Sequence, residues 1–237
     1  MITALLLACI ENQPMVVVEP AADTGEDELG WEQAPVFLGT AASIWGFDPD
    51  SGTLWNLGHL PSFSLDFQVA ESVVFAAAFQ ELKKSEIGAP SFTHVAVLPE
   101  WPNGFDLVGE TVLACGAHDL YEVDLTNLEI SVAAHTDEYL SGGDVLAWGD
   151  GRVYWAVVSE TEEPTLLQLE NGEITGEFAL GPHAVVGLAA MGSRMVGVTV
   201  QAEFVEVDLE RGGVTVLATL PDKGWTGAST NPAYNAP

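Results

Sequence analysis

Positively charged side chains are nearly absent from this chain of 237 residues. Six lysines and arginines face 35 aspartates and glutamates, which gives a formal net charge of -29. Lys and Arg supply most of the affinity of proteins for nucleic-acid phosphates and for anionic membrane surfaces. The composition therefore excludes both as electrostatic partners. The acid excess predicts a solubilising coat suited to an extracytoplasmic or saline setting.

Cysteine is also scarce, and long apolar runs are missing. Two cysteines, Cys9 and Cys115, cannot build a disulfide framework or a cysteine-based zinc site. Apart from residues 2–8, no run approaches the ~20 apolar residues of a transmembrane helix. The sequence has no G-x-S-x-G elbow, phosphate loop or nucleotide fingerprint, and its histidines lack H-x-x-x-H and H-x-H spacing. We therefore expect no cofactor and no metal.

Short apolar runs separated by glycine and proline turns fill most of the chain. Residues 184–221 contain four such runs, with breaks at residues 192–193, 201–203 and 211–213 and a stop at Pro221. Each run has the length of a β-strand and is too short for an ordinary helix. Four strands in about 40 residues is the size of one β-propeller blade.

Weaker copies of this unit recur along the chain. Runs like its second strand are centred near Gly39, Ala76, Ala114, Ala156 and Gly197. Third strands repeat an apolar-x-x-apolar-acid pattern, as in residues 120–124 (LYEVD). In the second repeat we place this strand at residues 94–98 and interpret residues 85–91, after two lysines, as an exposed loop. Regular spacing of this kind is typical of propeller blades.

The two ends of the repeat region complement each other. Residues 224–229 have the pattern of a first strand with no blade behind it, whereas the repeat that begins near residue 36 lacks its own first strand. Pairing the two would remove open sheet edges. We therefore predict an all-β fold: a single β-propeller of five four-stranded blades over residues 36–230, closed by the C-terminal strand, with a tail at 231–237.

The third strands also carry a family resemblance. LYEVDLTN (residues 120–127) and FVEVDLERGG (204–213) resemble the LYxVDxxTG strand-turn of many secreted bacterial propeller proteins. The resemblance covers roughly residues 36–230 and marks blades rather than a function. Five-bladed propellers include glycosidases and plant-type glutaminyl cyclases. As an alternative, the fold thus implies a hydrolase or glutaminyl-cyclase-like enzyme with channel carboxylates, for which Asp66, Asp106 and Asp144 are the candidates.

The N-terminus, MITALLLAC, resembles a bacterial lipobox at residues 6–9. This resemblance implies a signal segment at residues 1–8 and lipid on Cys9. Residues 9–35, rich in acid and free of Lys and Arg, would form a disordered tether. The implied location is secreted or on the bacterial cell surface, with membrane attachment only through the lipid. No basic residues precede the apolar core, which is itself short, so either the true start lies upstream or the resemblance is accidental. In the latter interpretation Cys9 stays a thiol able to pair with Cys115. With Cys9 lipidated, Cys115 is a lone thiol buried in a strand.

Loops that lead into the inner strands should frame one face of the ring. Their aromatic, carboxylate and imidazole side chains suit a small polar ligand or a sugar. These candidate ligand-binding residues are Trp101, His135, Asp137, Tyr139, His183, Asp222, Lys223 and Trp225. In the alternative interpretation, Trp101 and Trp225 pack between blades.

Together these features predict a monomeric, non-enzymatic, lipid-anchored propeller that binds a protein or a small polar ligand outside the cytoplasm. The enzyme is the alternative, and a structural envelope component that uses its acidic shell for spacing is the third hypothesis. Channel carboxylates within a few ångströms of one another would favour the enzyme. A channel packed with alanine and valine would argue against it.

Overall fold

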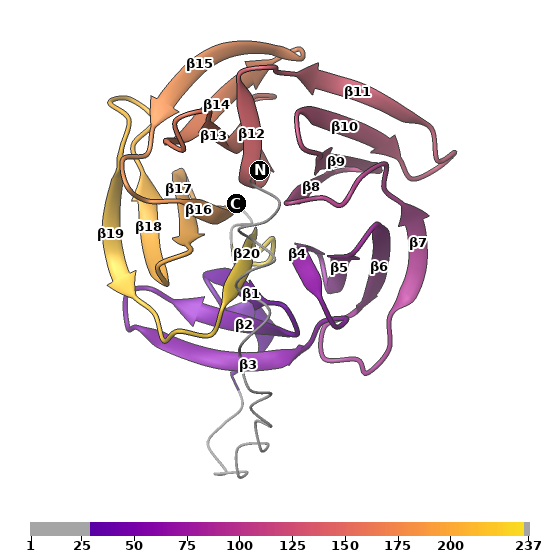
Figure 1. Cartoon of the computed structure of the whole chain (residues 1–237). Helices are drawn as coiled ribbons and strands as arrows, with labels where there is room; N and C mark the ends of the chain where they lie inside the picture. The colour runs from indigo at the N-terminus through magenta and orange to yellow at the C-terminus, as the bar shows by residue number, and fades with distance from the viewer. Residues whose placement is uncertain (1–28, 235–237) are drawn as a thin grey trace, which may run out of the picture.

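Residues 29–234 are described by the computed structural model, and their regular structure is almost entirely β (Figure 1). Twenty strands form five antiparallel sheets of four strands each, arranged as blades around a central axis. One short 3-10 turn, η1 (Trp31–Gln33), precedes them. Within residues 29–234 no helix is long and apolar enough to cross a bilayer. The predicted all-β, five-bladed propeller is confirmed.

In each blade the strands run from the inner strand, at the axis, to the outer strand in the order given. Blade 1 comprises β20 (Trp225–Thr230), β1 (Val36–Thr40), β2 (Ser43–Asp48) and β3 (Thr53–His59). Blade 2 comprises β4 (Ser64–Ala70), β5 (Val73–Ala78), β6 (Glu81–Glu86) and β7 (Thr93–Val97). Blade 3 comprises β8 (Phe105–Val108), β9 (Thr111–Cys115), β10 (Asp119–Asp124) and β11 (Ile130–His135). Blade 4 comprises β12 (Tyr139–Ala147), β13 (Val153–Ser159), β14 (Pro164–Glu170) and β15 (Glu173–Ala179), and blade 5 comprises β16 (Val185–Met191), β17 (Arg194–Thr199), β18 (Glu203–Val207) and β19 (Val214–Thr219).

Strand β20 closes the ring as the sequence predicts. It pairs with β1 from Val36 opposite Thr230 to Thr40 opposite Trp225, so the last strand completes the first blade. The side-chain amide of Asn231 adds a clasp, because its Nδ2 donates to the backbone carbonyls of Trp31 (2.9 Å) and Ala34 (2.7 Å). Both ends of the propeller are thereby held by one blade.

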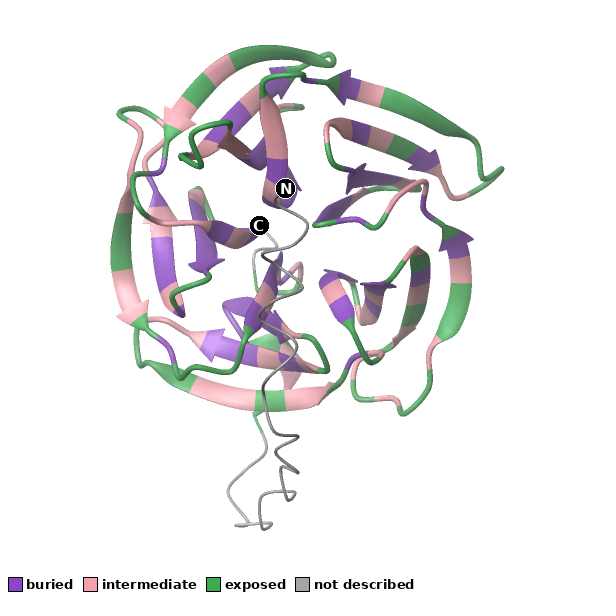
Figure 2. Ribbon diagram, in the orientation of Figure 1, coloured by how far each residue is buried: buried purple, intermediate pink, exposed green. Residues whose placement is uncertain are grey.

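Side chains become more exposed from the axis outwards (Figure 2). The second strands are largely buried, whereas outer strands such as β11 and β15 alternate or face solvent. Five apolar clusters fill the spaces between neighbouring blades, one for each contact around the ring. Phe47 of blade 1, for example, packs edge-on against Phe204 of blade 5, with ring centroids 4.9 Å apart. The blades are therefore joined mainly by burial of apolar surface.

Blade 2 departs from the strand assignment made on sequence. Its third strand is β6, which includes Lys83 and Lys84, and residues 93–97 form the fourth strand. Placing the third strand at residues 94–98 was wrong, whereas the loop predicted at 85–91 lies at residues 87–92, between β6 and β7. The reason is that β6 has only one buried residue, Leu82, while its other residues are exposed or half-buried. Elsewhere the predicted strand pattern holds, and Cys115 is a free, fully buried thiol.

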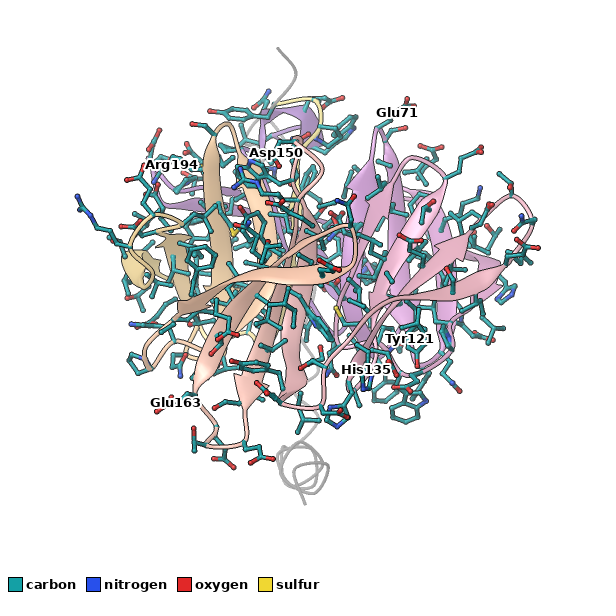
Figure 3. All side chains as sticks on the ribbon, turned by 90° about the horizontal axis from the view of Figure 1, so that it is seen from above. Glu71, Tyr121, His135, Asp150, Glu163 and Arg194 are labelled. Carbon is teal, nitrogen blue, oxygen red and sulfur yellow. The ribbon has the colours of Figure 1, made fainter. Side chains whose placement is uncertain are left out.

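Consecutive loops alternate between the two faces of the ring. One face carries the loops into the inner strands and those between second and third strands, including residues 60–63, 79–80, 98–104 and 136–138. We call it the aromatic face, after three side chains described below. Figure 3 shows the alternation edge-on: His135 lies towards the aromatic face, while Glu71 and Asp150 lie towards the opposite face.

Candidate functional site

Three exposed aromatic side chains lie in a row on the aromatic face. Phe63 precedes β4, Phe79 forms part of the β5–β6 turn, and Trp101 lies in the loop before β8. Ring centroids are 5.7 Å apart between Phe63 and Phe79 and 5.4 Å apart between Phe79 and Trp101. The three residues are 61%, 47% and 59% exposed, respectively. This row is named the aromatic patch.

The backbone of the aromatic patch is unusual. Phe63 and Phe79 have φ angles of 64° and 57°, in the left-handed region that large side chains rarely occupy. The corresponding turns of blades 4 and 5 place Glu162 and Ala202 at similar positive φ. The turn geometry therefore does not require an aromatic residue. Because bulky residues at such φ values mark strained positions that often serve function, the patch is the strongest candidate site on this face.

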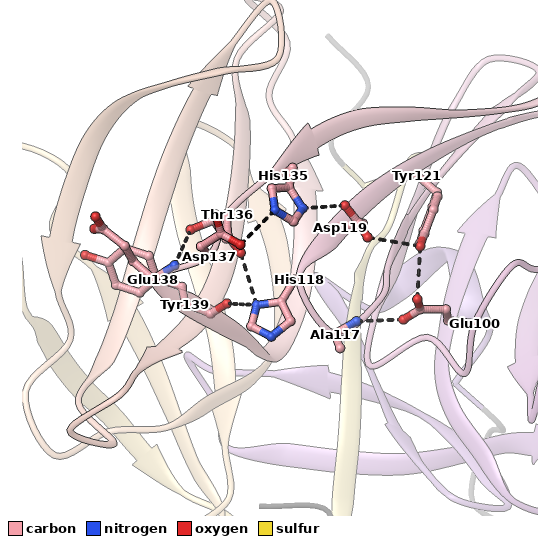
Figure 4. Close-up of polar contacts among 10 residues, drawn as sticks. All are labelled: Glu100, Ala117, His118, Asp119, Tyr121, His135, Thr136, Asp137, Glu138 and Tyr139. Carbon is pink, nitrogen blue, oxygen red and sulfur yellow. Dashed lines mark hydrogen bonds and ion pairs between the residues drawn. The ribbon is translucent and has the colours of Figure 1, made fainter.

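A hydrogen-bonded acidic network (Figure 4) begins at Glu100, the residue directly before Trp101 of the patch. Glu100 accepts hydrogen bonds from the hydroxyl of Tyr121 (3.0 Å) and the N–H of Ala117 (2.9 Å). Tyr121 also donates to Asp119 (3.2 Å), which contacts His135 Nδ1 at 2.7 Å. Desolvation, reinforced by the hydrogen bond to Glu100, raises the pKa of Tyr121 to about 12. Tyr121 therefore stays protonated, and its single O–H lies between the two carboxylates and can donate to either.

His135 joins the far end of this network. Its Nε2 lies 3.2 Å from Asp137, whose side chain is 95% exposed. The hydrogen bonds to Asp119 and then Asp137 raise the pKa of His135, because both favour the imidazolium form. His118 contributes to the adjoining loop, since its Nδ1 lies 3.0 Å from the carbonyl of Thr136 and 2.9 Å from that of Tyr139.

The other predicted site residues lie on the same face but do not converge. The hydroxyl of Tyr139 donates to Glu177 at 2.9 Å, and Nδ1 of His183 lies 2.8 Å from Glu203. Each of these pairs remains within its own blade. The structure thus distributes the predicted residues over separate local groups, and a ligand-binding role for them stays a prediction.

Lys223 and Trp225 form a separate group between blades 1 and 5. The ammonium of Lys223 lies 4.3 Å above the ring of Trp45, and Trp45 packs edge-on against Trp225. Trp225 is buried in the apolar cluster shared by these blades, and its indole N–H donates to Pro221. Asp222, in the same loop, is exposed. Trp225 thus packs between blades, whereas Trp101 is exposed on the surface.

Buried carboxylates line the axis of the ring. Asp66, Asp106 and Asp144 lie on inner strands β4, β8 and β12, and each accepts a hydrogen bond from a backbone N–H of the next inner strand. Hydroxyls of β20 do the same for the two remaining junctions. These bonds measure 2.7 to 2.9 Å, and their five acceptors around the ring are Asp66, Asp106, Asp144, Thr230 and Ser229. The axial carboxylates therefore join neighbouring blades.

Burial governs the protonation of these groups. Desolvation raises the pKa of Asp106 to about 7 and those of Asp66 and Asp144 well above their usual range. The charge of Asp66 raises the pKa of Asp144 further. Asp66 shares a side-chain hydrogen bond with Asp144, and its buried Oδ1, which meets no N–H or hydroxyl donor among the described residues, lies against the backbone of Gly227. At neutral pH this cluster therefore retains protons.

The described residues offer neither a deep pocket nor a metal-binding group as a better candidate site than the aromatic patch. A shallow depression on the opposite face is lined mainly by Pro35, Asp50, Met191, Arg194 and Tyr234. Its basic group is already engaged, since Arg194 pairs with Glu206 at 2.7 Å. Within residues 29–234, no group of three or more His, Cys, Asp or Glu side chains is arranged to hold a metal ion.

Sequence reasoning found Trp101 but missed Phe63 and Phe79. Phe79 ends the run VVFAAAF, in which it looks like another core residue, and Phe63 stands between two serines. The only available signal was that both lie in short turns, where a bulky side chain has nothing to pack against. Their positive φ angles have no counterpart in the sequence pattern.

Known proteins match this chain only through structure. No protein-family model and no curated protein matches the sequence. A chain from the crystal structure of a nidogen/laminin complex is similar with a TM-score of 0.55 and 14% identity, covering 82% of this chain and 96% of that one. Kuenenia stuttgartiensis hydrazine synthase matches with a TM-score of 0.45 and 10% identity, over 74% and 64% of the two chains. The first likeness shows the β-propeller fold alone, and the second is too weak to carry an argument.

Proposed function

We propose that this protein is a non-enzymatic binding module that recognises its partner through the aromatic patch. The observation that carries the proposal is the row of Phe63, Phe79 and Trp101, exposed on a ring whose blades pack tightly against one another. Exposed aromatic clusters of this kind mark interaction sites, because aromatic rings contribute large contact areas at low entropic cost. A rigid scaffold presents them without reorganisation on binding.

Backbone strain supports the same interpretation. A non-glycine residue in the left-handed region costs about 1 kcal/mol, and the patch carries two such phenylalanines. Neither ring is buried, so core packing does not offset this cost. Burial of the rings by a binding partner would offset it.

The alternative, a propeller hydrolase or glutaminyl-cyclase-like enzyme with channel carboxylates, has less support. The three axial carboxylates are the candidates for that chemistry, and they gather at the axis as such an enzyme would require. However, Asp66 and Asp144 are completely buried, and each axial carboxylate accepts a backbone N–H from the next blade. These contacts support a role in blade assembly, which is why we favour the binding module.

The binding proposal can be tested with the protein labelled with 5-fluorotryptophan. The fluorine resonance of Trp101, assigned by Trp101→Phe, reports on the patch during titration with a neutral oligosaccharide and with short cationic, anionic and neutral peptides. We expect one ligand to shift this resonance. Its affinity, measured by isothermal titration calorimetry because this variant lacks the reporting tryptophan, should fall at least about tenfold in the double variant Phe63→Ser, Trp101→Ser.

The matched control replaces two exposed apolar residues of the outer strand β11, Ile130→Ser with Val132→Ser, which are 49% and 55% exposed. Their loss should leave affinity within about twofold. Absence of any ligand that depends on the patch, or equal loss in the control, would contradict the proposal.

We further propose that the module is held at the bacterial cell surface by lipid on Cys9, which lies outside the described residues. The lipobox-like residues 6–9 and the acidic stretch after them support this. Metabolic labelling with a fatty-acid probe in a bacterial host should tag the wild type and spare Cys9→Ala, with Cys115→Ala as the control. Equal labelling of wild type and Cys9→Ala would contradict the anchor.

A further inference from the structure

The aromatic patch and the acidic network form one continuous surface over blades 2 and 3. Glu100 directly precedes Trp101 in the loop that enters β8. From Glu100 the hydrogen bonds run through Tyr121 to Asp119, and from there to His135 and Asp137 (Figure 4). Three carboxylates thus continue the line of rings across the rim.

We propose that this composite surface binds a cationic segment of a partner protein, in which apolar side chains cover the rings and basic side chains meet the carboxylates. The inference rests on the proposed binding function and names the chemistry of its partner. Charge complementarity is the main reason. The chain has a net charge of -29, so a second copy or any acidic partner would be repelled.

The surface has almost no basic groups of its own to neutralise its acids. Among the described loops of the aromatic face, the only lysine or arginine is Lys223, which lies over Trp45 in blade 1. Lys83, on β6 of blade 2, is paired with Glu81 at 2.7 Å. Next to the patch, only His135 offsets the carboxylates, and Asp137 remains 95% exposed beside it. A basic side chain from a partner therefore has open acceptors.

Ring geometry favours protein side chains over a stacked sugar. The planes of Phe63 and Phe79 are inclined by 42°, and those of Phe79 and Trp101 by 67°, so the rings do not form one flat platform. Inclined rings leave gaps for alkyl side chains and expose faces to guanidinium or ammonium groups. The molecule already uses this contact, with the ammonium of Lys223 above Trp45.

Fluorescence anisotropy with three labelled peptides tests this chemistry. The probes are short peptides of equal length that alternate leucine with arginine, with glutamate or with serine. We expect the arginine peptide to bind the wild-type protein at least about tenfold more tightly than the other two. Its affinity should also fall as salt concentration rises.

Two pairs of variants separate the surface from the overall negative charge. Asp119→Asn with Asp137→Asn removes two charges from the network, and Glu71→Gln with Glu110→Gln removes two from exposed turns of the opposite face (Figure 3). The first pair should weaken the arginine peptide about fivefold to tenfold, and the second by less than about twofold. Equal effects of the two pairs would mean non-specific attraction and would overturn the inference.

The inference and the binding function can fail separately. If a neutral peptide or an oligosaccharide binds and Phe63→Ser with Trp101→Ser abolishes its binding, the patch is a binding site and the cationic partner is wrong. If no ligand is lost with these two residues, both proposals fail. If the arginine peptide requires the rings and the carboxylates together, both stand.

Discussion

The axis of the ring buries carboxylates, whereas the aromatic face exposes large apolar rings. Each is the reverse of the usual preference, which places charged groups in solvent and apolar groups in the core. At the axis, three carboxylates are buried, although charged groups are costly to desolvate. On the aromatic face, three large rings are exposed, although burial would stabilise them. The axial carboxylates have partners, because each accepts backbone N–H groups between blades. The exposed rings contact one another but stay about half exposed, which is why the proposed function assigns them a partner.

The contrast teaches how to separate scaffold from site in this protein. The axial carboxylates accept hydrogen bonds from neighbouring blades, as a role in blade assembly requires. The aromatic rings are left exposed by the fold, as the proposed binding site requires. The predictions below alter one region and leave the other intact.

The largest loss of stability should follow from adding a methyl group between two inner strands at the axis. In Gly187→Ala the new methyl group would overlap the backbone N of Ala228, forcing inner strands β16 and β20 apart. We expect a loss of at least about 5 kcal/mol in the free energy of unfolding, enough to prevent folding. Urea unfolding followed by circular dichroism measures it.

The control for this substitution is Gly149→Ala, where no described residue other than the two chain neighbours lies within 4 Å of the added methyl group. It should change stability by less than about 0.5 kcal/mol. A stable Gly187→Ala protein would show that the inner strands are more loosely packed than the axis indicates.

The second prediction concerns the stability of the folded protein as rising pH deprotonates the buried axial carboxylates. The pKa of Asp106 rises from 3.8 to about 7 on burial, so the folded chain holds this proton more tightly than the unfolded chain. The contribution of this proton to the free energy of unfolding is fully present below about pH 4. It decreases as pH rises and is lost once pH exceeds about 7. At about 1.4 kcal/mol per pKa unit, the loss is on the order of 4 kcal/mol. Asp66 and Asp144 act in the same direction.

Urea unfolding at intervals between pH 5 and pH 8 measures this dependence. Surface carboxylates with a lowered pKa, such as Asp124 beside Thr126, contribute the opposite slope only as pH falls below about 4. Asp106→Asn should flatten the profile, because its amide cannot ionise. Stability that increases with pH over this window would show that the axial groups are ionised in the folded protein.

The smallest stability effect should come from the aromatic face. Phe63→Asn replaces a strained phenylalanine with a residue that adopts positive φ more readily. We expect no loss of stability and a gain of up to about 1 kcal/mol, since relief of strain offsets the lost contact with Phe79. Binding through the patch should weaken in the same variant. A loss of more than about 1 kcal/mol would assign the ring to the scaffold and blur the contrast.

Most of the fold could be predicted from the sequence, because blade strands recur with regular spacing and each second strand is apolar. The closing strand was predictable for the same reason, as residues 224–229 have an inner-strand pattern without a following blade. The third strand of blade 2 could not be predicted in this way, because β6 is mostly exposed and carries two lysines. A pattern based on burial is weakest for strands that bury little.

The candidate site was less predictable than the fold. Asp66, Asp106 and Asp144 could be assigned to inner strands, but their role depends on which backbone N–H of the next blade each one meets. That contact is set by the curvature of the ring and not by local sequence. Likewise, Phe79 resembles a core residue until the turn places it in solvent. Sequence periodicity indicates which residues share a strand face, and only the assembled ring shows which of them remain uncovered.

The position of β20 has a consequence for the order of events during synthesis. Residues 225–230 leave the ribosome after all other strands, yet β20 pairs with β1, and its hydroxyls bond to the inner strands of blades 2 and 5. Until then, β1 has an exposed edge and the ring has a gap where an inner strand belongs. Nascent blades can form in order, but the propeller cannot close before residues 225–230 have been synthesised.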